Sequence, residues 1–185
     1  MKTRIFTTGG TFDKRYDKVA GTFVFNGTAI RSILDEWDVQ PSTYSLTELF
    51  SVDSLEMTDD QRSEIAMACS VTPEPGIVIT HGTDTMVKTA RLLASKHLNK
   101  VIVLTGAMKP FAMRVTDAVH NLASAFTAVQ LLPPGVYVHM NGKSYPFDNV
   151  FKDTVAGVFK CICTHRYTEW VQNLRNLPAV VGTAA

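Results

Sequence analysis

The sequence has few cysteines, and this scarcity argues against a disulfide framework. Only Cys69, Cys161 and Cys163 occur among the 185 residues. Small secreted proteins that depend on disulfides carry more cysteines and usually an even number of them. We interpret Cys161 and Cys163 as two positions of one strand rather than as a bonded pair. All three thiols are therefore expected to be reduced.

An excess of charge of one sign and a long apolar run are also missing. Eighteen basic and 17 acidic side chains leave a net charge of +1, which creates no long-range field for gathering nucleic acid or an anionic membrane. Apolar runs such as residues 101–105 are far shorter than the roughly 20 residues of a membrane-spanning helix. Residues 1–10 lack the apolar segment and cleavage site of a signal peptide. We therefore expect a cytoplasmic protein that binds a small molecule, with no nucleic-acid or membrane partner.

Patterns of metal ligands are lacking too. His97, His120 and His139 show no ligand spacing, and the acidic residues form no set typical of a metal site. We expect neither a metal nor another cofactor.

The sequence does have the composition of a globular domain. Hydrophobic residues make up 45% of the chain and charged residues 19%, which is enough apolar surface to offset the entropy of folding. At roughly 150 residues per domain, the length indicates one domain. We assign it to residues 1–175 and expect residues 176–185 to be a tail rather than a second domain.

Apolar strand-like runs alternate with segments of helical periodicity. We expect strands at residues 3–7, 44–49, 77–80, 101–105, 136–140 and 155–163. We expect helices at residues 29–37, 58–68, 86–97 and 116–131, the second opening with a capping box from Thr58 to Gln61. Repeated strand–helix units predict a mostly parallel sheet, and continuously apolar strands indicate cover on both faces. The predicted fold is a doubly wound α/β, three-layer sandwich.

Polar, glycine-led segments follow two of the expected strands. Residues 7–11 read Thr-Thr-Gly-Gly-Thr, and residues 81–86 read His-Gly-Thr-Asp-Thr-Met. Each has a plain alternative, because Gly-Gly-Thr forms ordinary turns and Thr83, Asp84 or Thr85 could cap the following helix. Ligands of doubly wound folds bind at the carboxyl ends of the strands. The two segments together therefore suggest a small-molecule pocket with a threonine nucleophile.

These segments are similar to two signatures of the bacterial-type L-asparaginase family. Residues 7–11 resemble the first signature, and residues 79–86 resemble the second. Further similarity lies in residues 53–58, 104–110 and 140–142. The resemblance runs from residue 3 to about residue 160 and corresponds to the family's larger N-terminal domain, so it implies the same α/β fold.

The resemblance implies hydrolysis of L-asparagine to aspartate and ammonia through an acyl-enzyme. Thr11 matches the family's nucleophile, and Thr83, Asp84 and Lys152 match its second catalytic group. Asp84 would also bind the substrate's ammonium group, and Ser54 its carboxylate.

Two glycines and the histidine of the second signature complete the expected site. We expect Gly10 and Gly82 to contribute to substrate binding, and backbone amides near Thr83 to stabilise the oxyanion. His81 is interpreted as structural support of its loop rather than as a proton carrier.

Three departures from the family pattern affect the expected activity. Phe23 stands where the family has a loop tyrosine, with Tyr16 as the alternative, although either aromatic could simply be packing. Leu55 replaces a residue that is often polar. The family's C-terminal domain has no counterpart, so the site is either open on one side or closed by residues 164–170 in a homodimer.

Within that last segment His165, Arg166 and Glu169 are the candidate contributors. The leading hypothesis is an asparaginase-like amidohydrolase. The alternative is an amino-acid-binding protein that kept the pocket without efficient catalysis. A third reading, the ammonia-supplying subunit of a tRNA-dependent amidotransferase, is disfavoured because the first signature begins within ten residues of Met1.

Overall fold

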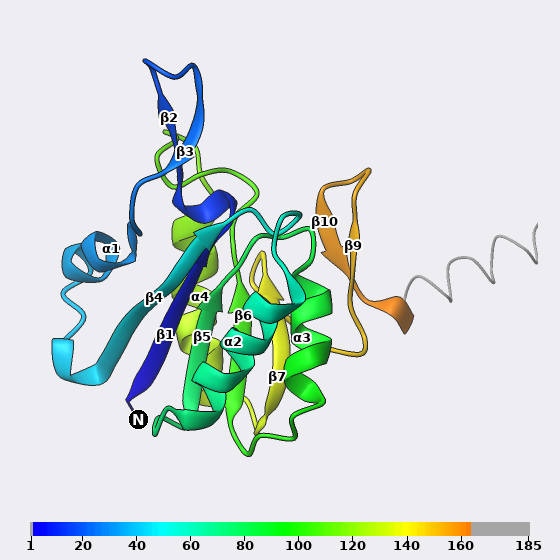
Figure 1. Ribbon diagram of the computed structural model, residues 1–185. Helices are drawn as coiled ribbons and strands as arrows, with labels where there is room; N and C mark the ends of the chain where they lie inside the picture. Colours follow the sequence, from blue (N-terminus) through cyan, green and yellow to red (C-terminus); the bar gives the residue numbers. More distant parts are fainter. Residues whose placement is uncertain (1, 164–185) are drawn as a thin grey trace, which may run out of the picture.

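A mostly parallel sheet of six strands forms the centre of the protein, of which the computed structural model describes residues 2–163 (Figure 1). The order of the strands across the sheet is β4-β1-β5-β6-β7-β8. Their bounds are β1 (Thr3–Gly9), β4 (Tyr44–Val52), β5 (Gly76–Thr80), β6 (Val101–Thr105), β7 (Gly135–Met140) and β8 (Lys143–Pro146). Neighbouring strands are parallel except β7 and β8, which are antiparallel. The predicted fold class is confirmed.

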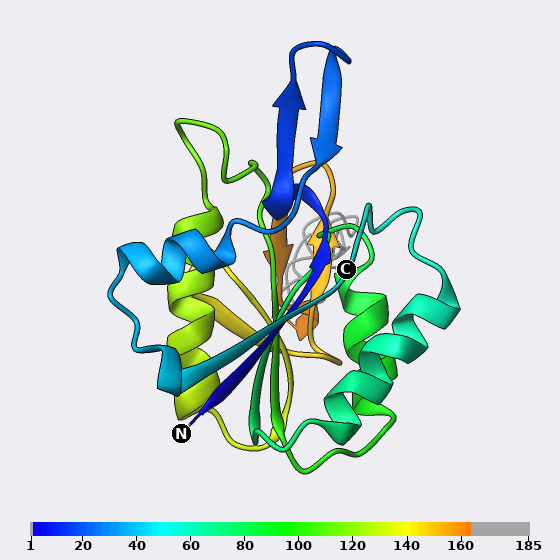
Figure 2. The same ribbon diagram turned by 60° about the vertical axis from the view of Figure 1, so that its left-hand side comes forward.

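Helices cover both faces of the sheet, as Figure 2 shows. The bounds are α1 (Ile30–Glu36), α2 (Asp59–Val71), α3 (Met86–Ala94) and α4 (Ala118–Leu131). One core cluster joins α2 and α3 to the sheet, and the other joins α1 and α4 to its opposite face. Successive strand residues alternate between the two cores: Ile77 and Ile79 belong to the first and Val78 to the second. This doubly covered sheet is why the strand sequences are continuously apolar.

Side-chain caps were expected at the N-termini of α2 and α3. Thr58 caps α2 in the predicted box, with its hydroxyl accepting from the Gln61 amide at 3.2 Å. At α3 the cap prediction is wrong, because Thr85 occupies the cap position without a side-chain cap hydrogen bond. Its hydroxyl instead donates to the carbonyl of Ser54 and accepts from Arg62, both at 2.8 Å.

Strand β8, two hairpins outside the main sheet and two short helices were not predicted. The hairpins pair β2 (Lys14–Asp17) with β3 (Thr22–Phe25) and β9 (Phe151–Asp153) with β10 (Val158–Lys160), and the 3-10 helices are η1 (Thr11–Asp13) and η2 (Pro41–Thr43). The strand expected over residues 155–163 is reduced to β10, because a turn with Gly157 at φ 66° precedes it. The β2–β3 hairpin projects beyond the carboxyl ends of the strands, and the β9–β10 hairpin stands at the flank of the molecule, on the side of α3 (Figure 1).

The cysteine prediction requires a correction. Cys161 and Cys163 form a disulfide, with their Cα atoms 5.5 Å apart. The expectation of one continuous strand failed because β10 ends at Lys160. The chain then turns and brings the two Cα atoms within disulfide range. Cys69 is free and buried.

Some expectations fall on parts of the chain that the structure does not describe. The candidates His165, Arg166 and Glu169 and the tail at residues 176–185 lie outside residues 2–163. Within the described part, no helix has the length and apolar character needed to cross a membrane.

Candidate active site

The loops that follow β1, β4 and β5 meet at the carboxyl end of the sheet. Gly9 and Gly10 have φ angles of 88° and 73°, a region that suits glycine. A Cβ at Gly10 would collide with the backbone of Gly82, and a Cβ at Gly82 would lie 2.6 Å from the Ser54 hydroxyl oxygen. The glycines of both signatures therefore let three backbones approach one another closely.

Lys152 joins the second signature to a distant hairpin. Its Nζ lies 2.8 Å from the Thr83 hydroxyl oxygen and 2.7 Å from Asp84 Oδ1. Lys152 lies on β9, opposite Phe159 of β10, and its side chain is 14% exposed. Thr83 is buried, whereas the Asp84 side chain is 42% exposed. The structure thus brings together three of the predicted residues, 69 positions apart in sequence at the widest.

The lysine contacts only one oxygen of the Asp84 carboxylate. Oδ1 accepts from Lys152, and Oδ2 has no hydrogen bond within residues 2–163. A carboxylate can accept several hydrogen bonds on its two oxygens. Asp84 can therefore hold Lys152 and a second cation at the same time.

Ser54 supplies a buried hydroxyl beside this group. It is 1% exposed, and among the described residues its oxygen has no hydrogen-bond partner. A buried polar atom without a partner is unfavourable unless a ligand or water satisfies it. The neighbouring Leu55 is exposed.

An ion pair that the sequence did not reveal lies next to Ser54. Lys14 of β2 contacts the Asp53 carboxylate at 2.5 Å. The hydrogen bond from Lys14, with a smaller effect from the charge of Lys152, lowers the pKa of Asp53. Asp53 therefore stays ionised and ties the β2–β3 hairpin to the loop after β4.

His81 is held inside its loop. The imidazole is fully buried: its Nδ1 donates to the Gly82 carbonyl at 2.7 Å, and its Nε2 accepts from the Thr89 hydroxyl at 2.8 Å. Burial lowers its pKa to about 4, so the ring is neutral near pH 7. Both ring nitrogens are occupied by the protein, which is the arrangement expected of structural support.

Thr11 and the loop aromatics are not joined to the Lys152 group by a hydrogen bond. Thr11 begins η1, directly after the Gly10–Gly82 contact, and within residues 2–163 its hydroxyl makes no hydrogen bond. Tyr16 and Phe23 lie opposite each other on the hairpin and are both exposed. Their ring centroids are 5.7 Å apart in an edge-on arrangement. In this structure the two rings pack on each other.

Comparison with known proteins identifies the family of this chain. Residues 2–166 match the family model described as "Asparaginase, N-terminal". The chain belongs to the asparaginase family.

Particular relatives are similar over different lengths. An L-asparaginase of Thermococcus kodakarensis is 46% identical over 65 residues, covering 34% of this chain and 20% of that protein. A glutamyl-tRNA(Gln) amidotransferase component of the same organism is 31% identical over 148 residues, covering 76% of this chain and 33% of that protein. The solved structure of the thermostable L-asparaginase from T. kodakarensis matches with a TM-score of 0.76 and 27% identity, over 88% of this chain and 51% of its own. The chain thus spans about half of that solved relative and no more than a third of these two curated ones.

Proposed function

We propose that this protein is an amidohydrolase that converts L-asparagine to L-aspartate and ammonia. Membership of the asparaginase family supports the hydrolase class. The observation that carries the specific proposal is the contact of Lys152 Nζ with both Thr83 and Asp84. A lysine placed between a hydroxyl and a carboxylate can hold or accept the proton that amide hydrolysis must move.

In the proposed reaction the Thr11 hydroxyl attacks the side-chain amide carbon of asparagine. A C–O bond forms, and the carbonyl electrons move onto oxygen to give a tetrahedral oxyanion that backbone amides near Gly82 and Thr83 stabilise. The C–N bond then breaks, and the nitrogen leaves as ammonia with the hydroxyl proton. Water hydrolyses the aspartyl ester, which restores Thr11 and releases aspartate.

The other residues of the site bind substrate and move the proton. Asp84 Oδ2 receives the α-ammonium group while Oδ1 keeps Lys152 in place. Ser54, whose buried hydroxyl has no partner in the described part of the chain, donates to the α-carboxylate. Thr83, which accepts a hydrogen bond from Lys152, relays the proton of the attacking water to the Thr11 oxygen as the ester bond breaks. The close approach of Gly10 to Gly82 supports this grouping, because Thr11 follows Gly10 and Thr83 follows Gly82.

The test is ammonia release by the purified chain with L-asparagine and with L-glutamine. We expect turnover with asparagine that falls by about two to three orders of magnitude in Thr83→Val, because valine keeps the shape of threonine but has no hydroxyl. Thr83→Ser is the matched control and should retain activity. Equal turnover by wild type and Thr83→Val would contradict the proposal. The comparison with glutamine is needed because one methylene changes binding by only about 1–3 kcal/mol.

A second candidate is an amino-acid-binding protein without efficient catalysis. It is supported by Phe23, which has no proton to exchange and packs against Tyr16 on the hairpin. Calorimetric titration with aspartate and asparagine separates the two candidates. Binding without ammonia release supports the second one, and no binding of either amino acid excludes it.

The amidotransferase relative supports a variant of the hydrolase proposal. Its match extends over 76% of this chain. In that variant, the ammonia released here is passed to a partner rather than to solvent. Stimulation of ammonia release by an acceptor complex would favour it. We also propose a homodimer, which sedimentation equilibrium would detect.

A further inference from the structure

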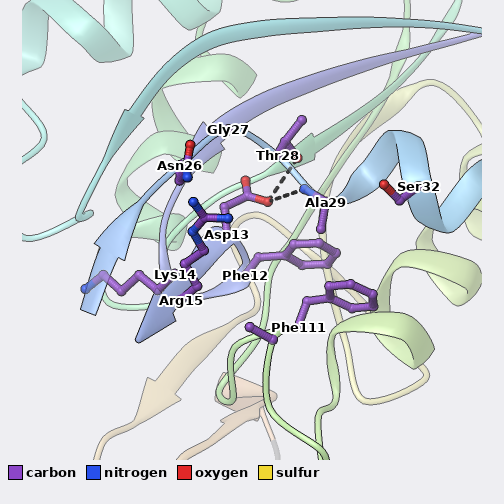
Figure 3. A pocket seen from close by; sticks show the side chains of 11 residues that line it. Phe12, Asp13, Lys14, Arg15, Asn26, Gly27, Thr28, Ala29, Ser32 and Phe111 are labelled. Atoms are coloured by element: carbon purple, nitrogen blue, oxygen red, sulfur yellow. Dashed lines mark hydrogen bonds between the residues drawn. The ribbon is translucent and has the colours of Figure 1, made fainter. Parts of the chain in front are cut away.

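A cavity lies beside the η1 turn. Its volume is about 310 Å³. It is bounded by η1, the β2–β3 hairpin, the start of α1 and residues 111–112 (Figure 3). Thr11, Thr83, Asp84 and Lys152 do not line it. The cavity is therefore separate from the candidate active site, although both adjoin the same short turn.

Asp13 places a buried, half-satisfied carboxylate in this cavity. Asp13 is 7% exposed. Oδ1 accepts from the Thr28 hydroxyl at 2.9 Å and from the Ala29 amide at 3.2 Å. Oδ2 is buried and has no hydrogen-bond partner among the described residues. In Figure 3 the two dashed bonds leave from one oxygen, and the other points away from Thr28 and Ala29.

None of the residues that the structure describes supplies a cation to that oxygen. Lys14 also lines the cavity, but its ammonium group is bonded to Asp53. Burial raises the pKa of Asp13 to about 6, and the charge of Glu48 contributes to the same shift. Near pH 7.5 the carboxylate is therefore ionised, at a place where a buried charge is favourable only with a partner.

Arg15 offers the opposite charge in the same cavity. Its guanidinium lies beside Asn26 in Figure 3, on the hairpin. Within residues 2–163 it forms no salt bridge, although its charge acts on Asp17. With the Asn26 amide in the orientation that satisfies both groups, the amide oxygen accepts from the Arg15 guanidinium, and a ligand carboxylate would take its place there. A guanidinium binds carboxylates well, because its planar fork matches the two oxygens.

An apolar wall completes the cavity. The rings of Phe12 and Phe111 lie together below the carboxylate in Figure 3. The Phe111 amide donates to the Phe12 carbonyl at 3.2 Å, which fixes the two segments against each other. Phe12 belongs to the core and is 0% exposed, so Phe111, which is only partly buried, supplies the apolar surface. The cavity thus presents a carboxylate, a guanidinium and an aromatic side chain, a combination typical of a site for a small zwitterion with an apolar body.

We propose that this cavity is a second small-molecule site, which binds a free α-amino acid with an apolar side chain. Its ammonium group donates to Asp13 Oδ2, and its carboxylate accepts from Arg15. Its side chain packs on Phe111, which Phe12 supports from the core. The proposal does not depend on asparagine hydrolysis, because none of the residues it uses belongs to the Thr83–Asp84–Lys152 group.

The test is isothermal titration of the full chain with L-leucine, which has no side-chain amide to hydrolyse. Two further probes each lack one charge: 4-methylpentanoate has no ammonium group, and 3-methylbutylamine has no carboxylate. We expect one site for leucine and binding about tenfold or more weaker for either probe, because each loses a charge-assisted hydrogen bond.

Substitutions of single residues test whether leucine binds in this cavity. Asp13→Asn and Arg15→Gln should each weaken leucine binding about tenfold or more. Arg31→Gln removes a neighbouring arginine of α1 that does not line the cavity, and it should leave the affinity unchanged. Thr83→Val should also bind leucine normally. Circular dichroism checks that Asp13→Asn is folded, and the exposed Arg15 provides an independent test.

Two outcomes would overturn the proposal. One is the absence of leucine binding to the folded chain. The other is binding that Thr83→Val abolishes and Arg15→Gln leaves intact, which would place leucine in the candidate active site. Loss of asparagine hydrolysis alone would bear only on the proposed function.

Discussion

Two buried titratable side chains close to the signatures have pKa values shifted in opposite directions. Desolvation favours the neutral form of each, so it raises the pKa of the Asp13 carboxyl to about 6 and lowers that of the His81 imidazole to about 4. Both lie next to residues of the candidate active site. As the pH rises from about 4 to about 6, the stabilising contribution of Asp13 therefore falls and that of His81 grows.

For Asp13 the folded state binds the proton more tightly than the unfolded state, whose carboxyl pKa is 3.8. Stability from this group is therefore highest at low pH and falls as the pH rises from about 4 to about 6. For His81 the unfolded pKa is 6.5. Its stabilising contribution is complete above that value and is lost as the pH falls towards 4.

The substitution Asp13→Asn isolates the effect of the Asp13 charge on stability. Asparagine can keep the bonds from Thr28 and Ala29 on its oxygen and carries no charge. We expect the variant to exceed wild type in free energy of unfolding by up to about 3 kcal/mol at pH 8, and to match it near pH 4. Urea denaturation at the two pH values measures the difference. If the variant's free energy of unfolding were lower than that of wild type by the same amount at both pH values, lost hydrogen bonds would outweigh the removal of the buried charge.

Helix α2 is linked to the site loops by one buried arginine. Arg62 is 2% exposed and donates to the Thr85 hydroxyl, which in turn donates to the Ser54 carbonyl. The loops after β4 and β5 are thereby held to each other and to α2. Both carry residues that we propose bind substrate, so their relative position should set substrate affinity.

Thr85→Val removes both of these hydrogen bonds. We expect it to lower the free energy of unfolding by about 1–3 kcal/mol, because Arg62 keeps a buried donor without that acceptor. We also expect the KM for asparagine to rise more than kcat falls, since the loops lose their mutual position. Thr85→Ser should restore both properties. Unchanged stability and an unchanged KM in the valine variant would contradict this role of Arg62.

The regular elements could be predicted from the sequence because each buries a periodic apolar face. Ile77 to Ile79 is one example, with consecutive residues in the two cores. The hairpins β2–β3 and β9–β10 could not, because their short, partly exposed strands carry no clear alternation. The Cys161–Cys163 disulfide was misread because spacing alone does not show where a strand ends.

The candidate site also has some residues that the sequence reveals and others that it does not. The signature loops mark Thr83 and Asp84 in a short segment, but Lys152 was recognised only through its resemblance to the family. The Lys14–Asp53 ion pair and the Arg62–Thr85 bond were missed. Contacts between segments distant in the chain leave no local signal in a single sequence.

At the scale of the whole molecule, the candidate site is assembled from segments between residues 9 and 152. The sheet contributes the loops after β1, β4 and β5, and β9 contributes Lys152. The chain spans about half the length of its solved asparaginase relative. The central claim is that these segments support covalent chemistry at Thr11.

The most direct test is mass spectrometry of the purified chain, acid-quenched during incubation with L-asparagine and digested. The account predicts an aspartyl group on the peptide that contains Thr11, and neither adduct nor ammonia in Thr11→Val. Ammonia release that persists in Thr11→Val, or folded wild-type protein that forms no adduct and releases no ammonia, would contradict it.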